Sequence, residues 1–587
     1  MNLKSRSMRS KSGIILSMVL IFTMSATSLV YADGQQNIRT YMYSKDKAED
    51  ISCYIKDDVP VPYVAVDDYL GRVYTISFSS EKLEDGTYRI SNKRGQMIVD
   101  PAKDTIIFDE FERFLYLDGR IDPKDDNQVL YERQEDFSYA GEPKALEMKL
   151  GDYDIDIIEE GERVYLPLTT ISDIAAITYC SAVYADNAIS FNYSLQTPFV
   201  NWRNNLNSPQ RTAEEAAFTY NELCFVMDHL YVCPSRCAYA DDIKNKGFDR
   251  TLGEGGSETR LVRDYLLSEN TSRFVLGVAI LSLMLDDGGH TYLEYILSNG
   301  NTAAISGYNN ILADPSDPGT ALYSKWKVKK QNRIAASGRI KNYLSGYDRY
   351  EAVKLFDVKG VGASDRYRYY EYDDTGIFVY TSYDERAVEQ FKRALDMAKA
   401  HGMKNFVLDE SYNYGGYFES AMYMVNALTG ENRYFFEGPV TGNIIVTDDS
   451  FDMDLDGDYE GEGEDFSYSF NYGVICSAGS YSAGNIMPCL VKKEGIPIIG
   501  ETSGGGGCYM GEFKMAMGNL YCLAAYATLK TKDGESVEAG AKPDHEIGDY
   551  SDFHDFALID SIMDEHYKNA PTLAELGDKK RAPRVGE

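Results

Sequence analysis

The chain has 587 residues, which is too long for one ordinary domain and predicts two or three. Hydrophobic residues make up 44% and charged residues 26% of the sequence, a balance that excludes a chain disordered throughout. The formal net charge of −33 argues against nucleic acid as a partner, because an acidic surface repels phosphate backbones. We therefore expect a globular protein with a sizeable core that acts on something other than nucleic acid.

The first 32 residues have the pattern of a secretory signal peptide. Four basic residues precede an apolar run over residues 14–24, which is too short to span a bilayer, and Val30-Tyr31-Ala32 has small residues at the two key positions of a cleavage site. We expect cleavage after Ala32 and a protein that is secreted or held at the cell surface, without stable membrane insertion. An uncleaved anchor is the alternative. Cleavage would remove four positive charges and no acidic residue, and would bring the net charge to about −37.

Nine cysteines are spread thinly along the chain, an odd number that does not indicate a disulfide framework. Most of them are interpreted as small buried apolar residues. The spacing of His229, Cys233 and Cys237 could indicate a metal site, but three ligands without a second pair are a weak signal, and a helix face with a local disulfide is the favoured interpretation. We expect neither a metal nor another cofactor.

Residues 33–195 are expected to form a β-rich N-terminal module. Short alternating runs such as Arg72–Phe78 predict strands, and residues 164–191 predict a strand, a short helix and a second strand. This succession resembles the N-terminal domain of copper amine oxidases, a common surface module in bacteria. The resemblance implies no copper here, because this part of the chain has no convincing cluster of ligands.

Residues 200–372 are expected to hold a helical subdomain and an insert without assignment. The apolar run 274–285 predicts a buried helix that ends before Asp286-Asp287-Gly288-Gly289-His290-Thr291, so that the side chain after the glycines is held in a fixed place. Residues 292–372 show no clear period, and no substrate-binding PDZ module is recognisable there.

Residues 373–550 alternate short apolar runs with amphipathic segments, which predicts a mixed or parallel sheet covered by helices and thus an α/β architecture. Helices are expected over 385–401 and 419–428, and buried strands over 406–408, 474–475 and 496–499. Gly518-Asn519 between two apolar runs predicts a hairpin. Residues 551–587 are expected to form a C-terminal helix and a flexible tail.

An acidic tract over residues 448–465 holds ten Asp or Glu in eighteen positions. Asp452, Asp454, Asp456 and Gly457 match the first half of a calcium-binding loop, but the twelfth position, which needs Glu, is Gly463. A solvated acidic excursion is the favoured interpretation, and loose binding of calcium stays open.

Ser482 is the candidate nucleophile. It lies between a buried strand and a helix, in V-I-C-S-A-G-S-Y-S-A-G-N, where the positive end of the helix dipole is near. The local spacing is close to that of a nucleophile elbow, but Ser480 stands where the first glycine belongs. Taken alone, Ser482 would be interpreted as a helix cap.

The order of motifs around Ser482 resembles that of the tail-specific, or C-terminal processing, serine peptidases. Three segments match motifs of that family, in the same order. They are Asp409-Glu410-Ser411-Tyr412-Asn413-Tyr414-Gly415-Gly416, then Gly495 to Gly505, then Asp533-Gly534 with Glu538, Gly540, Pro543 and Asp544. The resemblance covers residues 375–548 and implies a peptidase core with a fold similar to that of ClpP and the crotonases, acting as a serine-type endopeptidase on peptide or protein substrates. Association with a cell wall stays open.

Two forms of catalysis occur in the family that these motifs resemble. One pairs the serine with a lysine about two dozen residues later, but no lysine lies between Lys493 and Lys514. The other, similar to the tricorn core proteases, uses a histidine of a D-G-x-H-T segment, and His290 fills that place. An imidazole with a near-neutral pKa can take the proton of the serine and return it to the leaving amine. His290 is therefore the expected general base, with a capping or core histidine as the alternative.

The remaining roles are less sharply assigned. Glu538 is the expected carboxylate that orients the base, with Asp287 and Glu501 as rivals and a surface turn as the alternative for Glu538. Backbone amides of Gly416 (or Gly415) and of Ala483 are expected to bind the oxyanion and the substrate carbonyl. The usual arginine of the first glycine loop is Ser411 here, and the acidic residue three positions after the nucleophile is Asn485.

The sequence thus favours a secreted serine peptidase that forms an acyl-enzyme on Ser482 with His290 as general base. Two other readings remain. One is a non-catalytic binding protein of the cell surface built on a peptidase-like scaffold, and the other is a calcium-dependent structural protein organised by the acidic tract.

Overall fold

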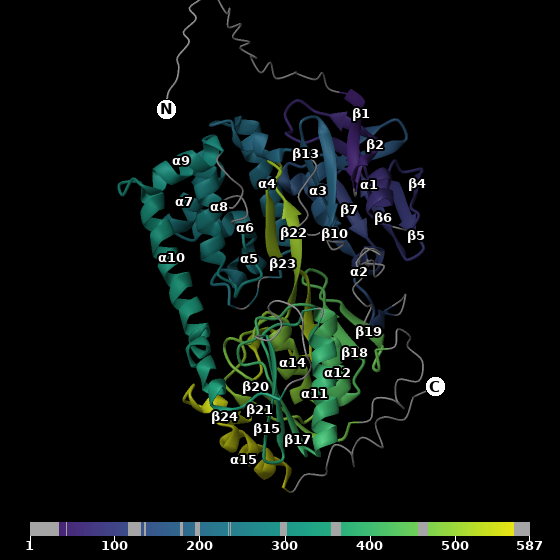
Figure 1. Ribbon diagram of the computed structural model, residues 1–587. Helices are drawn as coiled ribbons and strands as arrows, with labels where there is room; N and C mark the ends of the chain where they lie inside the picture. The colour runs from purple at the N-terminus through teal and green to yellow at the C-terminus, as the bar shows by residue number, and fades with distance from the viewer. Residues whose placement is uncertain are drawn as a thin grey trace, which may run out of the picture.

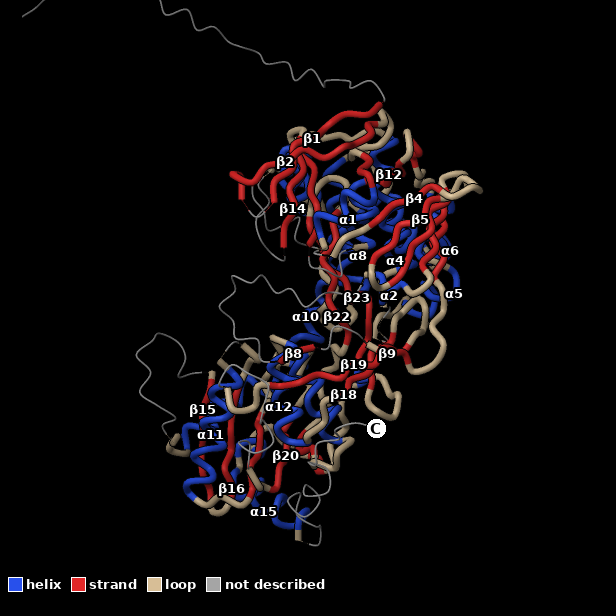
Figure 2. Tube along the Cα trace, turned by 90° about the vertical axis from the view of Figure 1, so that its right-hand side faces the viewer, coloured by secondary structure: helices blue, strands red, loops and turns tan. Residues whose placement is uncertain are grey.

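A computed structural model describes residues 34–42, 44–74, 76–115, 131–133, 137–175, 180–193, 200–232, 234, 236–293, 302–353, 366–384, 386–455 and 468–568. The expected signal segment, Cys233, most of the expected C-terminal tail and the second half of the acidic tract lie outside these residues. The molecule has two lobes, and a long helix, α10 (Pro318–Ser337), runs from the upper lobe to the lower one (Figure 1). A hairpin of β22 (Cys508–Lys514) and β23 (Leu520–Lys530) also passes between the lobes (Figure 2).

Two sheets built from the amino-terminal residues form one side of the upper lobe. Their elements are β1 (Gly34–Met42), β2 (Ser44–Ile55), β3 (Tyr63–Ala65), α1 (Val66–Val73), β4 (Ser79–Lys82), β5 (Tyr88–Asn92), β6 (Gly95–Asp100), β7 (Thr105–Phe108), α2 (Phe111–Phe114), β10 (Leu146–Lys149), η1 (Leu150–Tyr153), β11 (Ile158–Glu160), β12 (Arg163–Pro167), α3 (Leu168–Ile174), β13 (Cys180–Ala185) and β14 (Ala188–Tyr193). The strand orders are β11-β12-β3-β2-β1-β14-β13 and β10-β7-β6-β5-β4. The predicted succession of strand, helix and strand over residues 164–191 is confirmed by β12, α3 and β14.

The strand predicted over Arg72–Phe78 is wrong. Residues 66–73 form α1, and its buried side chains are Val66, Tyr69, Leu70 and Val73, spaced by three and four residues as one face of a helix requires. Arg72 and Val73 are the last residues of this helix. The sequence predicts a strand there because apolar and polar residues alternate from Arg72 to Phe78. The next strand, β4, begins only at Ser79.

Helices fill the rest of the upper lobe. They are η3 (Trp202–Leu206), α4 (Ala213–His229), α5 (Ala240–Lys246), α6 (Phe248–Glu254), α7 (Ser257–Leu266), α8 (Thr271–Leu285), α9 (Ala303–Leu312) and the first part of α10. After α10 follows η5 (Arg339–Arg349), whose Ile340 and Tyr347 belong to a core of the lower lobe. In α8 every residue except Arg273 is buried, which places this helix at the centre of the lobe. The residues that had no assignment in the sequence thus form α9, α10 and η5 between Thr302 and Arg349, joined by turns at residues 313–317 and 338.

The lower lobe is built on a six-stranded sheet of order β15-β16-β17-β20-β21-β24. Its elements are β15 (Tyr367–Tyr372), β16 (Thr375–Tyr380), α11 (Ala387–His401), β17 (Asn405–Asp409), α12 (Phe418–Thr429), β20 (Asn471–Cys476), α14 (Ala483–Lys492), β21 (Ile498–Gly500), η6 (Val537–Ala539), β24 (His545–Glu546), η7 (Asp552–His554) and α15 (Phe556–Tyr567). Strand β15 is antiparallel to β16, and the remaining neighbours are parallel. The predicted α/β class with a mixed sheet is confirmed.

Both faces of this sheet are covered, as a mostly parallel sheet requires. On β17, Phe406 and Leu408 belong to the apolar core that contains residues of α11, α12 and α14, whereas Val407 belongs to the core under α15. The same alternation holds on β20, where Val474 faces the first core and Ile475 the second. Because both faces are covered, the loops at the ends of the strands are where a substrate could bind.

A second sheet joins the lower lobe to the amino-terminal part. Its strands are β22 and β23 with β18 (Arg433–Glu437), β19 (Ile444–Phe451), β8 (Tyr131–Arg133) and β9 (Ser138–Tyr139), in the order β22-β23-β18-β19-β8 with β9 also on β19. Two strands from within the range expected for the N-terminal module therefore pair with a strand of the lower lobe. The hairpin predicted at Gly518-Asn519 is confirmed, because the N–H of Met515 donates to the carbonyl of Asn519 between β22 and β23.

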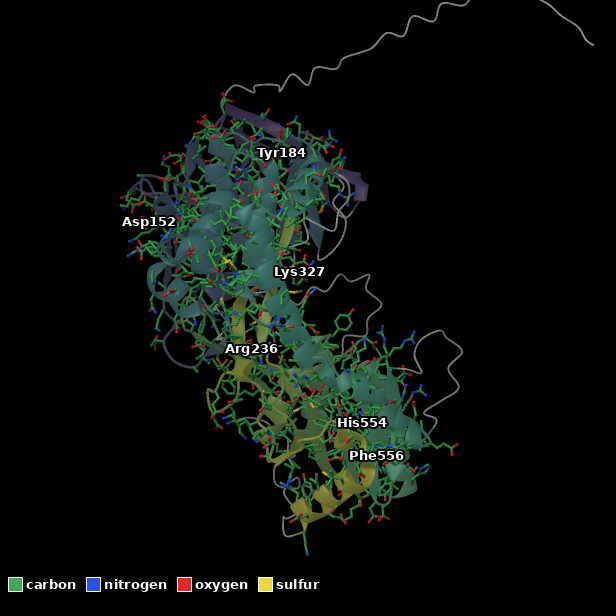
Figure 3. The ribbon with its side chains drawn as sticks, turned by 90° about the vertical axis from the view of Figure 1, so that its left-hand side faces the viewer. Asp152, Tyr184, Arg236, Lys327, His554 and Phe556 are labelled. Atoms are coloured by element: carbon green, nitrogen blue, oxygen red, sulfur yellow. The ribbon has the colours of Figure 1, made fainter. Side chains whose placement is uncertain are left out.

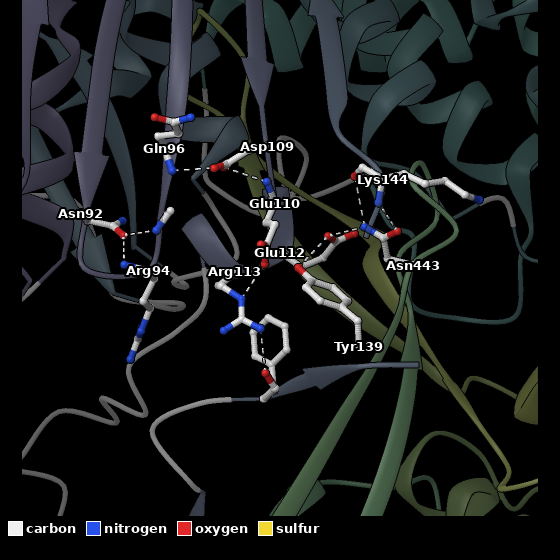
Figure 4. A network of polar contacts seen from close by, with 12 residues as sticks. Asn92, Arg94, Gln96, Asp109, Glu110, Glu112, Arg113, Tyr139, Lys144 and Asn443 are labelled. Carbon is white, nitrogen blue, oxygen red and sulfur yellow. Dashed lines mark hydrogen bonds and ion pairs between the residues drawn. The ribbon is translucent and has the colours of Figure 1, made fainter. Parts of the chain in front are cut away.

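Buried polar groups fasten this junction (Figure 4). The Glu112 carboxylate accepts hydrogen bonds from Asn443 Nδ2 at 3.0 Å, from the Tyr139 hydroxyl at 3.4 Å and from the Thr441 hydroxyl. Asn443 also accepts from the N–H of Lys144 at 2.9 Å. The carboxylate in α2 thus holds the turn between β18 and β19.

Eight cysteines lie in the described residues, and all eight are free and buried. Within the same part of the chain, no helix combines the length and the apolar character needed to cross a bilayer.

Replacement of Asn443 by Ala should lower the free energy of unfolding by about 1–3 kcal/mol, because it removes one of the three hydrogen bonds to the buried Glu112 carboxylate and leaves the N–H of Lys144 without its partner. Urea unfolding measures this effect. Asn309→Ala is the control, since Asn309 is exposed on α9, and its effect should stay within about 0.5 kcal/mol. Equal stability of the two variants would contradict the role of this junction.

Candidate active site

Three loops meet at the carboxyl edge of the lower sheet. They follow β17, β20 and β21, and the carboxyl ends of neighbouring parallel strands lie side by side. Side chains of one loop bond to the backbone of the next: Ser480 Oγ donates to the carbonyl of Glu410 at 2.7 Å, and Ser477 Oγ donates to that of Ser411 at 2.6 Å. The first glycine-containing motif and the segment that leads to Ser482 are therefore held together.

Ser482 stands on a strained turn between β20 and α14. Its backbone has φ 57° and ψ −124°, a conformation that a residue with a Cβ rarely adopts. Its N–H donates to the carbonyl of Gly505 at 2.9 Å, which ties the turn to the loop after β21. The Ser482 side chain makes no capping bond to α14. The helix-cap interpretation of this residue is therefore wrong, and its hydroxyl is available for another contact.

Gly415 makes this turn fit. It has φ 98°, and a Cβ there would lie 2.7 Å from the Cβ of Ser482 and 2.9 Å from the nitrogen of Ala483. Such distances are shorter than any side chain tolerates, so only glycine can occupy this position. The D-E-S-Y-N-Y-G-G segment thus contacts the Ser482 turn through bare backbone.

His290 and Ser482 are brought together from positions 192 residues apart. His290 Nε2 lies 3.1 Å from Ser482 Oγ, within hydrogen-bond distance. Burial lowers the pKa of His290 below its ordinary value, and the nearby charge of Asp287 opposes this shift. A lowered pKa keeps the imidazole neutral near pH 7, the form that can accept a proton.

Three elements hold the loop that presents His290. Helix α8 ends at Leu285, and Arg333 of α10 donates to Asp286 Oδ1 at 2.8 Å just after that end. Beyond His290, the N–H of Tyr292 donates to the carbonyl of Cys522 in β23 at 3.0 Å. The ring of Tyr481 packs edge-on against the imidazole, with 5.1 Å between the ring centroids.

Cys508 occupies the side of His290 that faces away from Ser482. Its Sγ lies 3.4 Å from His290 Nδ1, and its thiol lies close enough to the carboxylate of Glu538 in η6 to lower the pKa of that carboxylate. Burial raises the pKa of Cys508 well above its ordinary range, so the thiol keeps its proton. A protonated thiol can accept from Nδ1–H, and in that tautomer Nε2 is the acceptor toward Ser482. Burial also raises the pKa of Glu538, and the nearby Cys508 thiol and the N–H of Gly507 oppose this.

Among the described contacts, none joins Glu538 to His290, and Glu538 neighbours the Cys508 thiol that contacts Nδ1. Its rivals lie elsewhere: Asp287 accepts from the Tyr231 hydroxyl at 3.0 Å, and Glu501 accepts from the Tyr550 hydroxyl at 3.1 Å. Asp287 acts on the imidazole through charge, and Glu501 has no described contact with it.

The backbone amides near Ser482 differ in availability. The N–H of Gly415 donates to Asn413 Oδ1 at 2.9 Å and is occupied. Within the described residues, the N–H groups of Gly416 and Ala483 donate to no acceptor. Of the three expected donors, these two remain open to a bound group.

Asn485, at the position where the family resembled has an acidic residue, connects three elements. Its Nδ2 donates to the carbonyl of Val537 at 2.9 Å, while its Oδ1 accepts from Ser503 Oγ at 2.7 Å and from the N–H of Gly505 at 3.1 Å. An ionised carboxylate could not donate to Val537. The amide therefore suits this site, and the departure leaves the loop around Gly505 in place.

Two neighbours of the site were not identified from the sequence, namely Cys508 and Arg236. Arg236 is exposed, and a Cβ at Gly505 would lie 3.2 Å from its guanidinium. Neither residue belongs to a sequence motif. They lie near Ser482 because the fold brings the start of β22 and the segment after α4 to the site. Among the described residues, no three His, Cys, Asp or Glu side chains are arranged to hold a metal ion.

A comparison with protein families identifies part of the lower lobe. Residues 374–547 match the model of peptidase family S41. Comparison with curated proteins gives no match.

Solved structures that this chain resembles are distant. A photosystem II D1 C-terminal processing protease is 19% identical, over 30% of this chain and 42% of that one, with a TM-score of 0.24. A lipoprotein from Streptococcus agalactiae is 11% identical, over 50% of this chain and 96% of that one, with a TM-score of 0.27. The tricorn protease is 16% identical, over 43% of this chain and 20% of that one, with a TM-score of 0.23.

These three likenesses are too weak to add to the family match, and this chain spans less than half of the D1 processing protease. The resemblance of the N-terminal module to copper amine oxidases stays a prediction. The family match coincides with the lower sheet and with three of its motif loops, and on this ground residues 374–547 form a domain of peptidase family S41.

Proposed function

We propose that this protein is a serine peptidase that hydrolyses peptide bonds through an acyl-enzyme on Ser482. The observation that carries the proposal is the 3.1 Å contact between Ser482 Oγ and His290 Nε2 on a strained turn inside the family S41 domain. The strain favours a functional role, because a positive φ at serine costs free energy that a mere helix start does not require.

The reaction would run in two stages. His290 Nε2 accepts the proton of Ser482 as Oγ attacks the substrate carbonyl, and the N–H groups of Gly416 and Ala483 bind the oxyanion that forms. His290 then gives this proton to the leaving amine as the peptide bond breaks. In the second stage, His290 accepts a proton from water, which attacks the ester on Ser482, and the carboxylic acid product leaves as Oγ regains its proton.

His290 needs one defined tautomer for both stages. Cys508 would fix it by accepting from Nδ1–H and by donating its own proton to the neighbouring carboxylate of Glu538. Glu538 would thus orient the base through Cys508, and Asp287 would add a stabilising charge when His290 is protonated.

Cleavage within polypeptide chains and export with removal of residues 1–32 are further parts of this proposal. They rest on the motif order and on the signal pattern of the sequence.

A small uncharged fluorophosphonate should label the intact protein, because it reacts with an activated serine. Labelling should vanish in Ser482→Ala and slow by at least about 100-fold in His290→Ala, which loses the general base. Gel fluorescence after timed reaction measures both rates. Ser316→Ala, at an exposed serine of the upper lobe, is the control and should label like the parent. Absence of labelling in the parent protein would favour the non-catalytic scaffold.

The rate of labelling should fall at acid pH with a midpoint below 6.5, the ordinary pKa of histidine. Only the neutral imidazole accepts the serine proton, and burial lowers the pKa of His290, so the active form persists to a lower pH than a solvated histidine would allow. Timed labelling across a pH series, with circular dichroism to verify folding at each point, gives the midpoint. A midpoint at or above 6.5 would contradict the environment described for His290.

Cys508→Ser should label at a rate within a few fold of the parent, because a hydroxyl can also donate to Glu538 and accept from Nδ1. Cys508→Ala should slow labelling by about 10- to 100-fold and move the pH midpoint, because His290 loses its link to Glu538. Cys224→Ala, which empties a buried site in α4, controls for general loss of packing. Equal rates and midpoints for Cys508→Ser and Cys508→Ala would refute the positioning role of Cys508.

A further inference from the structure

The segment from Pro318 to Tyr347 has a charge opposite to that of the rest of the chain. It carries seven Lys or Arg and no Asp or Glu, in a protein whose net charge is −33. The segment comprises α10 and most of η5. A concentration of one sign against an opposite overall charge is a local electrostatic feature that can select a partner.

Two of the seven cations serve the fold. Lys325 pairs with Glu258 at 2.6 Å, and Arg333 pairs with Asp286 at 2.7 Å. The other five form no ion pair with any described residue, and we call them the basic strip: Lys327, Lys329, Lys330, Arg339 and Lys341. Four of the five are exposed, and Lys330 is half-buried.

The basic strip leads to the Ser482 site. Where α10 ends, a Cβ at Gly479 would lie 3.1 Å from the carbonyl oxygen of Ser337, which places the helix end against the loop that precedes Ser482. Lys341 lies over the ring of Tyr412 with 6.0 Å to its centroid. From Ser337 back to Lys327 the helix rises about 15 Å, a span that about five residues of extended chain would cover.

Arg236 adds a further cation beside the site. It is exposed, lies against Gly505 and forms no ion pair with a described residue. The carbonyl of Gly505 accepts from the N–H of Ser482, so this guanidinium is close to the nucleophile. Figure 3 shows Arg236 and Lys327 on the side of the molecule along which α10 runs.

Apolar groups lie between these cations. Val328 and Ile334 of α10 are 55% and 52% exposed, and Tyr414 and Tyr417, which flank the Gly415-Gly416 pair, are 49% and 47% exposed. Large apolar side chains at such exposure indicate a contact surface when they gather in one region. Alternating cations and apolar groups suit a polypeptide with carboxylates better than they suit a bare polyanion.

We propose that the basic strip binds acidic stretches of a polypeptide substrate and leads them to Ser482. This inference rests on the proposed peptidase function and names its substrate class. Five cations without an ion-pair partner on α10 and the start of η5 attract carboxylates, and the acidic remainder of the surface repels them, so that an acidic chain is directed to this part of the molecule. The attraction should weaken as salt screens exposed charges.

The test uses the full-length protein with Ser482→Ala, so that the probe is not consumed. The probes are a fluorescein-labelled peptide of alternating Glu and Ala and its counterpart with Gln in place of Glu. Anisotropy titrations at low and high salt give the affinities. The Glu peptide should bind at least about tenfold more tightly than the Gln peptide at low salt, and this preference should shrink at high salt.

The decisive variant is Lys327→Gln with Lys329→Gln and Lys330→Gln. It should lose most of the preference for the Glu peptide. The matched control changes Lys244, Lys399 and Lys404 to Gln, with the same change in net charge, at exposed positions on α5, at the end of α11 and just before β17. The control should keep the preference within about twofold, because exposed charges elsewhere contribute little.

Three outcomes would overturn the proposal: equal binding of the Glu and Gln peptides, equal loss in the decisive and control variants, or equally tight binding of a single-stranded DNA of the same charge. Fluorophosphonate labelling separates this failure from that of the proposed function. Both triple variants with Ser482 intact should label at the parent rate, since the probe is uncharged.

Discussion

The turn at Ser482 is the constraint on which the rest of the site depends. A serine at φ 57° and ψ −124° is stable only where its surroundings determine the backbone, and three neighbours do so here. Gly415 leaves room for the Ser482 side chain, Gly505 accepts from its N–H, and Asn485 holds Gly505 in turn. The two glycine-containing segments that identify the domain in sequence are thus the two surfaces between which the turn is fixed.

The position of His290 shows how the upper lobe takes part in the chemistry. The histidine belongs to a loop between a buried helix, α8, and a bridge to β23, and Arg333 of α10 fastens the start of that loop. The hairpin of β22 and β23 supplies both that bridge and Cys508. A change in the contact between the lobes would therefore move the base relative to the nucleophile, and the buried polar junction at Glu112 has a bearing on function as well as on stability.

Much of the site was predictable from sequence because family motifs fix residue order, and residue order fixes which loops meet at the edge of a parallel sheet. This placed Ser482, Gly416 and Ala483 at one point, and the lack of a lysine before Lys514 directed attention to His290. The link through Cys508 was not predictable, because a thiol at hydrogen-bond distance from an imidazole has no signature in spacing. The helix α10 was missed for a related reason: from Lys327 onward most of it is exposed, so it lacks the apolar period that reveals packed helices. The error at Arg72–Phe78 has a different cause. A short alternation of apolar and polar residues overlaps the end of helix α1 and has the period of a strand.

The central claim is that Ser482 carries the acyl group during turnover. A p-nitrophenyl ester mixed rapidly with the protein provides the direct measurement, as a burst of nitrophenolate followed by mass spectrometry of the quenched protein. The account predicts a burst of one equivalent per chain and an acyl group on the peptide that contains Ser482. Steady release without a burst, or turnover that survives in Ser482→Ala, would contradict it.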